Sequence, residues 1–185
     1  MRIISGTHKS RLIHTPKNLP VRPTTDLAKE ALFNILVNNF DLSEVSVLDL
    51  FAGTGGITYE FLSRGATGVT SIDLDLRCVN FIRQTAKDFG FEAVLCFRSD
   101  AFRFLKNCEN QYDIIFCDPP YELEGIESIP LTVADRKLLK PDGWLILEHS
   151  DDYDFSTLPG FYQHRKYSKV NFSIFEAETD SEEAE

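Results

Sequence analysis

The segment Asp118-Pro119-Pro120-Tyr121 combines residue types that can prepare an amino group for reaction, and it directly follows the apolar run YDIIFC. The amine of a nucleic-acid base is a weak nucleophile because its lone pair is delocalised into the ring, and two acceptors on its hydrogens free that pair. Asp118 can supply one acceptor. Pro120 keeps Pro119 out of the α-helical region, so the Pro119 carbonyl can supply the second. Tyr121 offers a ring on which an extruded base can stack.

Two other interpretations of this segment explain less. A Pro-Pro turn in an ordinary loop accounts for the prolines, but not for an acid and an aromatic ring at the end of an apolar strand. Cys117 raises the alternative of attack on a ring carbon by a Pro-Cys thiolate. Because the order here is Cys-Asp-Pro-Pro, we expect Cys117 to pack inside the strand. The segment therefore predicts catalytic residues at Asp118, Pro119, Pro120 and Tyr121.

A glycine-containing turn, DLFAGTGG from Asp49 to Gly56, follows a second apolar run. Glycines let a backbone approach a ligand closely because they carry no side chain. A dinucleotide-binding turn would need a third glycine where Thr58 stands, so a pyrophosphate ligand is disfavoured. The turn suits the methionyl part of S-adenosylmethionine, with backbone amides for its carboxylate and Asp49 for its ammonium. Taken alone, the turn also fits a plain strand-to-helix connection.

Two further acids stand where strands are expected to end. Asp73 follows the glycine turn by about 20 residues, the separation at which an acid commonly binds ribose hydroxyls, and Asp100 can accept a hydrogen bond from an adenine amine. Asp75 fits better as the N-cap of the next helix, and a cap is the alternative for Asp100 as well. The predicted cofactor is S-adenosylmethionine, and its predicted contacts are Asp49, Phe51, Ala52, Gly53, Gly55, Asp73, Leu74, Asp100, Ala101 and Asp118.

Strand-like and helix-like segments alternate along the chain and must position these motifs. Strands are expected at 45–51, 68–73, 92–98, 112–118 and 144–149, the last after a KPDG turn, with a hairpin over 161–178. Helices are expected at 24–40, 57–64, 76–89, 101–107 and 127–139. The first should bury a face made of Leu27, Ala28, Ala31, Leu32, Ile35 and Leu36 and take its N-cap from Thr24, Thr25 or Asp26.

This alternation predicts an α/β fold, and together with the glycine turn and the segment Asp118–Tyr121 it indicates the Rossmann-like, class I methyltransferase type. We expect a mostly parallel seven-stranded sheet with helices on both faces and a C-terminal antiparallel hairpin. Ligands bind such sheets beyond the carboxyl ends of the strands, so the predicted site residues should meet at one edge.

Charge is distributed unevenly along the chain. The net charge is −10, yet residues 1–24 contain five basic residues and no acid. Clustered cations bind phosphates, so we expect RNA contacts from Arg2, Lys9, Arg11 and Arg22, together with Tyr121. Residues 178–185 are rich in acids and predict a disordered tail. The chain thus divides into a basic arm (1–24), a methyltransferase domain (25–177) and an acidic tail (178–185).

The composition disfavours several other classes of protein. No apolar run approaches the roughly 20 residues that span a bilayer. Cys78, Cys96, Cys108 and Cys117 form no CxxC pair, and the four histidines show no metal-binding spacing, so reduced core thiols and no metal site are expected. We expect a cytoplasmic, monomeric protein without a membrane partner.

The chain also resembles a known family, the bacterial RsmD family of 16S rRNA guanine-N2 methyltransferases. The resemblance rests on FAGTG, DPPY, RPTTDLAKEALFNIL and the opening MRIISGTHKSRLI, and it runs from Met1 to about Phe175. Ser5 and Ser10 stand where that family's arm usually has glycine, and Asp73 replaces the more usual Glu. The resemblance implies methylation of the exocyclic N2 amine of a guanine in 16S rRNA. The roles it implies place Asp49, Gly53 and Gly55 at the methionine portion, Asp73 at the ribose, Asp100 and Ala101 at adenine, and Asp118, Pro119 and Tyr121 at the guanine amine.

Two alternatives remain open at the level of the sequence. The first is an amino-methyltransferase acting on adenine or cytosine in nucleic acid, or on a glutamine amide; such enzymes normally bring a target-recognition domain, for which 185 residues leave no room. The second is a non-catalytic RNA-binding assembly factor that has kept the fold, against which the intact Asp118 and glycine turn argue. The residue pattern alone does not separate guanine from adenine. We expect the partner to be 16S rRNA within a small-subunit particle rather than naked RNA, because a small domain has limited surface for specific binding.

Overall fold

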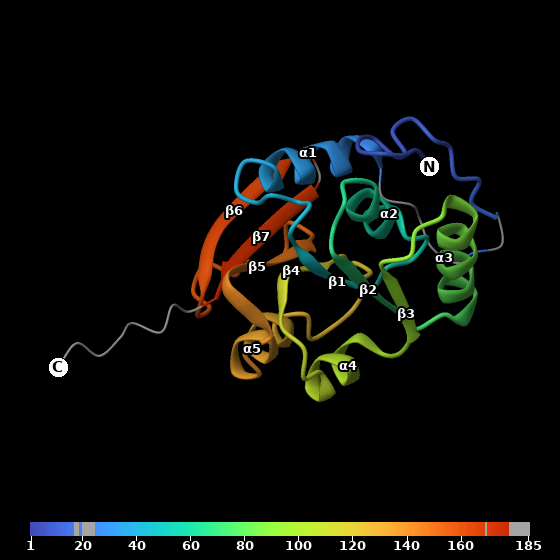
Figure 1. The fold of residues 1–185 in the computed structure, drawn as a ribbon. Helices are drawn as coiled ribbons and strands as arrows, with labels where there is room; N and C mark the ends of the chain where they lie inside the picture. Colours follow the sequence, from blue (N-terminus) through green and yellow to red (C-terminus); the bar gives the residue numbers. More distant parts are fainter. Residues whose placement is uncertain (17–18, 20–24, 169, 178–185) are drawn as a thin grey trace.

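A seven-stranded sheet runs through the middle of the molecule in the computed structural model, which describes residues 1–16, 19, 25–168 and 170–177 (Figure 1). Its strand order is β3-β2-β1-β4-β5-β7-β6. The first five strands in this order run parallel, whereas β7 is antiparallel to β5 and β6 is antiparallel to β7. The strands are β1 (Ser46–Leu50), β2 (Gly68–Asp73), β3 (Val94–Arg98), β4 (Tyr112–Cys117), β5 (Leu139–His149), β6 (Phe161–Tyr167) and β7 (Val170–Glu176). The predicted sheet and hairpin are confirmed, with β6 at one edge.

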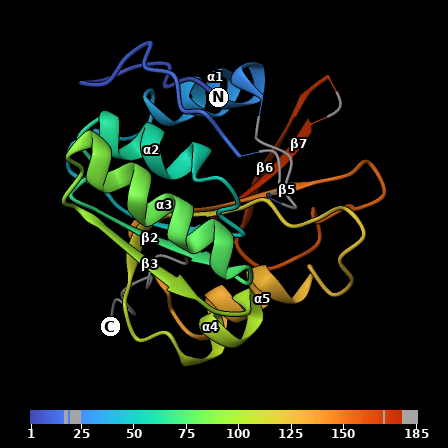
Figure 2. The ribbon, with the colours of Figure 1, turned by 90° about the vertical axis from the view of Figure 1, so that its right-hand side faces the viewer.

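Helices cover both faces of this sheet (Figure 2). α1 (Asp26–Leu36), α2 (Gly56–Ser63) and α3 (Leu76–Phe89) lie on one face, and α4 (Ala101–Asn107) and α5 (Ser128–Asp135) lie on the other. An apolar cluster that includes Leu105 fills the space under α4 and α5, and a second that includes Phe61 lies under α1 and α2. A third, smaller cluster joins Ile3 and Ile13 of the N-terminal arm to Ile82 of α3. The arm is therefore packed against the domain.

Short polar side chains fix where three of the helices begin. The side chains of Thr25, Asp75 and Asp100 accept hydrogen bonds from the first-turn amides of α1, α3 and α4, respectively. Such caps satisfy amides that have no partner inside the helix. Gly90 ends α3 with a φ of 70°, a left-handed conformation that glycine adopts without strain. The predicted α3 and the predicted cap at Asp75 are confirmed.

Leu27 is a misprediction of the helical pattern. It was expected in the buried face of the first helix, but its side chain is 68% exposed. Lys29 of the same helix is buried instead, and its ammonium donates to the Arg2 carbonyl and pairs with Glu60 at 3.8 Å. A periodicity argument ranks lysine as polar, so it could not identify a cation buried by an acid from another helix.

The KPDG segment is a second difference from the sequence prediction. It was expected as a turn before the last parallel strand, yet β5 already begins at Leu139 and includes it. The pairing with β4 jumps from Tyr112 opposite Leu139 to Ile114 opposite Trp144, so the segment bulges out of the ladder. Asp142 takes a φ of 60° in this bulge, where the backbone turns locally without leaving the strand.

The sheet changes direction between β1 and β4. From β1 the chain continues outward to β2 and β3 on one side, and from β4 to β5 on the other. At such a switch point, the connections leave the carboxyl ends of two neighbouring strands toward opposite sides and open a crevice for ligands. The glycine turn follows β1 and the segment Asp118–Tyr121 follows β4, so the fold brings both motifs to this crevice. Among the described residues, no helix is long and apolar enough to cross a membrane.

Candidate active site

Asp73 holds the glycine turn in place from the neighbouring strand. The Gly53 amide donates to one oxygen of the Asp73 carboxylate and the Asp75 amide donates to the other, each at 2.8 Å. Gly55 has a φ of 79°, and a Cβ added there would lie 2.7 Å from the Tyr59 ring. The turn therefore needs glycine at this position for both backbone conformation and space. Burial raises the pKa of Asp73, which indicates a carboxylate partly removed from water.

The first amides of α2 have no side-chain cap, and Thr54, Gly55 and Gly56 at this end of the helix are buried. Its N-cap is Gly55, in contrast to the side-chain caps of α1, α3 and α4. Amides at a helix N-terminus carry partial positive charge and bind anions such as a carboxylate. This end of α2 lies directly after β1, where the predicted methionyl carboxylate is expected.

Asp49 lies near the end of β1 and is buried. Its carboxylate accepts a hydrogen bond from the Thr58 hydroxyl at 2.5 Å, and that hydroxyl also lies 2.7 Å from the Ser71 hydroxyl. Burial first, and then the nearby Asp118 carboxyl, raise the pKa of Asp49 to about 7. A dinucleotide-binding turn would have glycine at position 58. Here Thr58 occupies it, and the Thr58 hydroxyl orients the Asp49 carboxylate.

The segment Asp118-Pro119-Pro120-Tyr121 leaves the end of β4 at the crevice. Asp118 is half-buried, Pro119 is buried, and the Tyr121 side chain is 57% exposed. Burial raises the pKa of Asp118 to about 6. Cys117, the last residue of β4, is fully buried and its pKa is raised well above the ordinary value by burial, so it packs inside the strand as expected. All four cysteines are buried and free.

Glu148 is a site residue that the sequence reasoning missed. It lies near the end of β5 and is only 5% exposed, although it carries an ionisable group. The Tyr121 hydroxyl lies 3.5 Å from one of its carboxylate oxygens. Burial first, and then the nearby Asp118, raise the pKa of Glu148 to about 8. The signal in the sequence was an acid at the end of the apolar run WLILEH, the same position relative to its strand that singled out Asp118.

The remaining predicted cofactor contacts occupy the same edge of the sheet. Phe51 has a φ of 59° and its ring packs edge-on against Phe102 at 6.4 Å. Leu74 is exposed just beyond β2, and Ala101 is buried at the start of α4. Asp100 accepts a hydrogen bond from the Arg103 amide, so the helix cap that was the alternative for this residue is present. One of its carboxylate oxygens makes that bond, which leaves the side chain compatible with both roles.

The basic arm is anchored by Glu60, a second buried acid that the sequence reasoning missed. The Ile4 and Ser5 amides donate to its carboxylate at 2.9 and 3.0 Å. Arg64 and Lys29 complete its surroundings, with ion-pair distances of 2.9 and 3.8 Å. The arm backbone is thereby fixed to the end of α2 that lies away from the glycine turn.

The predicted RNA-binding cations of the arm differ in their surroundings. Arg2 forms an ion pair with Asp26 at 3.4 Å, Arg11 lies over the Phe89 ring at 5.4 Å, and Lys9 is exposed. Arg22 lies outside the described residues. Ser10, where the resembled family usually has glycine, adopts a φ of 68°, the left-handed conformation that explains the usual glycine.

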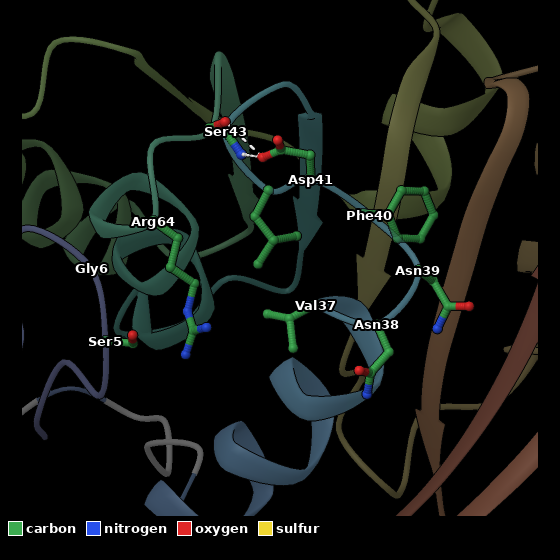
Figure 3. A pocket seen from close by; sticks show the side chains of 10 residues that line it. Ser5, Gly6, Val37, Asn38, Asn39, Phe40, Asp41, Ser43 and Arg64 are labelled. Atoms are coloured by element: carbon green, nitrogen blue, oxygen red, sulfur yellow. Dashed lines mark hydrogen bonds between the residues drawn. The ribbon is translucent and has the colours of Figure 1, made fainter.

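A pocket of about 670 Å³ lies away from the crevice. Its lining comes from Ser5 and Gly6 of the arm, the loop 37–43 and Arg64 (Figure 3). The loop precedes β1, so the pocket lies toward the amino ends of the strands. Figure 3 shows the Asp41 carboxylate accepting hydrogen bonds from Ser43, and the Arg64 guanidinium donates hydrogen bonds to Glu60. Its polar groups are thus used within the protein, and it lacks the acids that define the crevice.

The crevice fits S-adenosylmethionine in the kind of groups it offers. The uncapped N-terminus of α2 suits the carboxylate, the buried Asp49 suits the ammonium, and Asp73 suits the ribose hydroxyls. In the described part of the chain, no ion pair joins Asp49, Asp118 or Glu148 to a cation, so these acids remain available to ligands. When bound, S-adenosylmethionine supplies an electrophilic methyl group. Fold and site together define a class I, S-adenosylmethionine-dependent methyltransferase.

The comparisons with known proteins narrow this class to one family. The family model described as conserved hypothetical protein 95 matches residues 1–176, and the chain belongs to this family, the RsmD family. The ribosomal RNA small subunit methyltransferase D of Haemophilus influenzae is 34% identical over 157 residues, covering 82% of this chain and 80% of that protein. Bacillus subtilis YlbH is 32% identical over 164 residues, covering 86% and 88%. The structure of Escherichia coli yhhF matches with a TM-score of 0.83 at 26% identity and covers 97% of this chain and 98% of that one.

Proposed function

We propose that the protein transfers a methyl group from S-adenosylmethionine to the exocyclic N2 amine of a guanine in 16S rRNA. The observation that carries the proposal is the position of the Asp118 carboxyl, at the end of β4 and beside the glycine turn of β1. The ribosomal RNA small subunit methyltransferases D among the relatives support 16S rRNA as the substrate. The choice of guanine rests on the resemblance carried by the sequence motifs.

The side chains around the crevice divide the work between binding and reaction. The amides of the glycine turn and Asp49 hold the methionyl group, Asp73 holds the ribose and Asp100 holds the adenine. Asp118 accepts a hydrogen bond from the amine as positive charge develops on its nitrogen, and the Pro119 carbonyl accepts the second. Because burial raises the pKa of Asp118, the carboxylate is also basic enough to take up the proton that the nitrogen releases. Tyr121, more than half exposed, gives the flipped base a ring to stack on.

Contacts with the ribosome form the second part of the proposal. The basic arm (1–24) presents Lys9 and Arg11 on the surface beside the domain (25–177), and cations of this kind bind phosphates whatever the net charge elsewhere. A single small domain with a short arm suits a partly assembled small-subunit particle better than naked RNA, since ribosomal proteins then help to present the target. The protein acts as a monomer in the cytoplasm, without a metal ion.

The test is to map the methylation of 16S rRNA by mass spectrometry. RNA from a strain that lacks the gene should miss one N2-methylguanine, and the gene supplied again should restore it. Purified protein should methylate particles from the deletion strain faster than protein-free 16S rRNA. A missing methyl group on adenine or cytosine would replace guanine as the substrate, and no missing group together with no measurable affinity for S-adenosylmethionine would replace the enzyme with an RNA-binding module.

A further inference from the structure

Glu148 and Asp118 lie side by side at the crevice. Cys117 of β4 pairs with Leu147 of β5 in a parallel ladder, so the next residue on each strand reaches the same level of the sheet. Neighbouring strands are about 4.8 Å apart. Phe116 and Ile146, two residues before Asp118 and Glu148, both belong to the apolar cluster under α1 and α2. Because side chains alternate between the faces of a strand, Asp118 and Glu148 project from this same face.

One oxygen of the Glu148 carboxyl has no hydrogen-bond partner among the described residues. This oxygen, Oε2, is buried, while Oε1 lies 3.5 Å from the Tyr121 hydroxyl. The ionisable neighbours that face Glu148 are Asp118 and Tyr121, and on the other side β7 places Phe172 opposite it. A buried carboxyl with an unused acceptor is costly unless a ligand supplies a donor. In its ionised form this oxygen is satisfied by a ligand that carries an N–H or O–H group into the crevice.

The edges of the three amino-bearing bases differ in the atom beside the amine. In guanine the ring nitrogen N1 carries a hydrogen, so N1 and the N2 amine are adjacent donors. In adenine and cytosine, the ring nitrogen next to the amine is an acceptor. An ionised carboxylate can only accept hydrogen bonds. It therefore pairs with the guanine edge and repels the lone pair of the other two, which is selection by both attraction and repulsion.

We propose that Glu148 is the specificity-determining residue of this enzyme, and that its Oε2 accepts a hydrogen bond from the ring N1–H of the target guanine. The N2 amine then stays with Asp118 and the Pro119 carbonyl. This inference rests on the proposed function, and it names the group that reads the base, which the DPPY motif by itself does not do. Tyr121 supports Glu148 through its hydroxyl as well as offering its ring.

The titration of Glu148 is consistent with this role. Burial raises its pKa, so much of the carboxyl holds a proton at neutral pH, and a bound N1–H group favours the ionised form. Discrimination for guanine should therefore increase as the pH rises toward 8.5 or so, near and above the pKa of about 8. Asp118 and Asp49, the other acids of the crevice, have raised pKa values of about 6 and about 7 and are ionised over most of this range.

The experiment compares guanine with 2-aminopurine, which keeps the amine but has no hydrogen on N1. Small-subunit particles are reconstituted around 16S rRNA with either base at the mapped target, built from a ligated synthetic segment. For the wild type we expect kcat/KM to favour guanine by roughly tenfold to a hundredfold at a slightly alkaline pH. Glu148→Gln presents an N–H donor that matches the bare N1 of 2-aminopurine. It should lower the guanine rate, raise the 2-aminopurine rate and so reduce or invert the preference.

Two controls separate this role from a structural one. Glu44→Gln changes an exposed acid in the loop before β1, far from the crevice, and should keep the wild-type preference. The affinity of Glu148→Gln for S-adenosylmethionine, measured by calorimetry, should equal that of the wild type. If the wild type methylates guanine and Glu148→Gln shows the same preference between the two bases, the assignment of Glu148 is wrong and the proposed function stands. If the wild type methylates no guanine in 16S rRNA, both are wrong.

Discussion

Two groups of buried acids in this protein have opposite surroundings. Glu60 at the arm anchor is satisfied from all sides by two backbone amides, Arg64 and Lys29. Asp49, Asp118 and Glu148 at the crevice are also withdrawn from water, but no ion pair with a cation compensates them in the described residues. Their pKa values are raised, the first cause in each being burial. Glu60 therefore has its charged and hydrogen-bonding partners without a ligand, whereas the crevice acids obtain such partners only when a ligand binds.

This contrast separates structural acids from functional ones without reference to any motif. Burying a carboxylate is expensive, and a structural carboxylate repays the cost through its own partners. Where the partners are absent, the protein retains an unfavourable arrangement that a ligand relieves. Altering one acid at a time should therefore change stability at the arm anchor and activity at the crevice.

The largest expected effect is on stability, at the arm anchor. Glu60→Ala removes the acceptor of two arm amides and leaves the buried Lys29 with one acid, Asp26 at 3.6 Å, beside the Arg2 carbonyl. Because a buried charge loses its main partner, we expect the free energy of unfolding to fall by about 3 to 5 kcal/mol. Urea denaturation measures it, with the exposed Glu30→Ala on α1 as control. A loss below about 1 kcal/mol, the size of an exposed ion pair, would contradict the view of Glu60 as an anchor.

Asp118 should affect the rate rather than the stability. Asp118→Ala removes a hydrogen bond that strengthens as charge develops on the amine, so we expect the rate constant to fall by roughly a hundredfold to a thousandfold. Asp118→Asn keeps an acceptor oxygen and should retain more activity. Single-turnover methylation at saturating RNA and cofactor makes this measurement, with little change expected in cofactor affinity. A near-normal rate for Asp118→Ala would show that the DPPY segment has a structural role and no catalytic one.

A smaller effect is expected at Asp73, which combines the two roles: it accepts hydrogen bonds from the protein backbone, and it is predicted to bind the ribose. Asp73→Ala releases the Gly53 and Asp75 amides and removes the ribose acceptor. We expect cofactor binding to weaken by about 1.5 to 3 kcal/mol, the usual value for a hydrogen bond to a charged group. Calorimetric titration tests this, and Asp75→Ala is the matched control, because it removes a helix cap and an ion pair with Arg77 but no predicted cofactor contact. Equal affinity in Asp73→Ala and wild type would exclude Asp73 from the site.

The smallest expected effect is a pH dependence. A carboxyl whose folded pKa is raised binds more protons in the folded state, so folding stability falls as pH rises from the unfolded pKa to the folded one. For Asp49 the fall extends from its ordinary 3.8 to about 7. Asp49→Asn should flatten part of this dependence in the ligand-free protein. Thermal unfolding of variant and wild type at a series of pH values from about 4 to about 7 measures it as the difference between the two curves. Parallel curves would show that Asp49 is already compensated.

The fold was largely predictable from the sequence because its signals are local. The parallel strands β1 to β4 are short apolar runs that are followed by a glycine turn or an acid. Both ends of α3 were predicted correctly, because Asp75 caps its start and Gly90 ends it. Lys29 was not predictable, since its burial depends on Glu60, which belongs to a helix formed far along the chain. Glu148 was missed for a similar reason. Its importance follows from the pairing of β4 with β5, which only the sheet topology reveals.

Helix α2 joins the two regions that differ so strongly. Its first residue belongs to the glycine turn, and its last, Ser63, receives hydrogen bonds from the Thr7 and His8 amides of the arm. A Cβ added to Gly6 would lie 1.8 Å from the Ser63 carbonyl oxygen, so the arm and the end of the helix are in close backbone contact. A helix of this length is a stiff rod of about 12 Å. If RNA binding at the arm changes the affinity for the cofactor through this helix, cofactor binding must change the affinity for RNA by the same factor, because thermodynamic coupling between two binding sites is reciprocal.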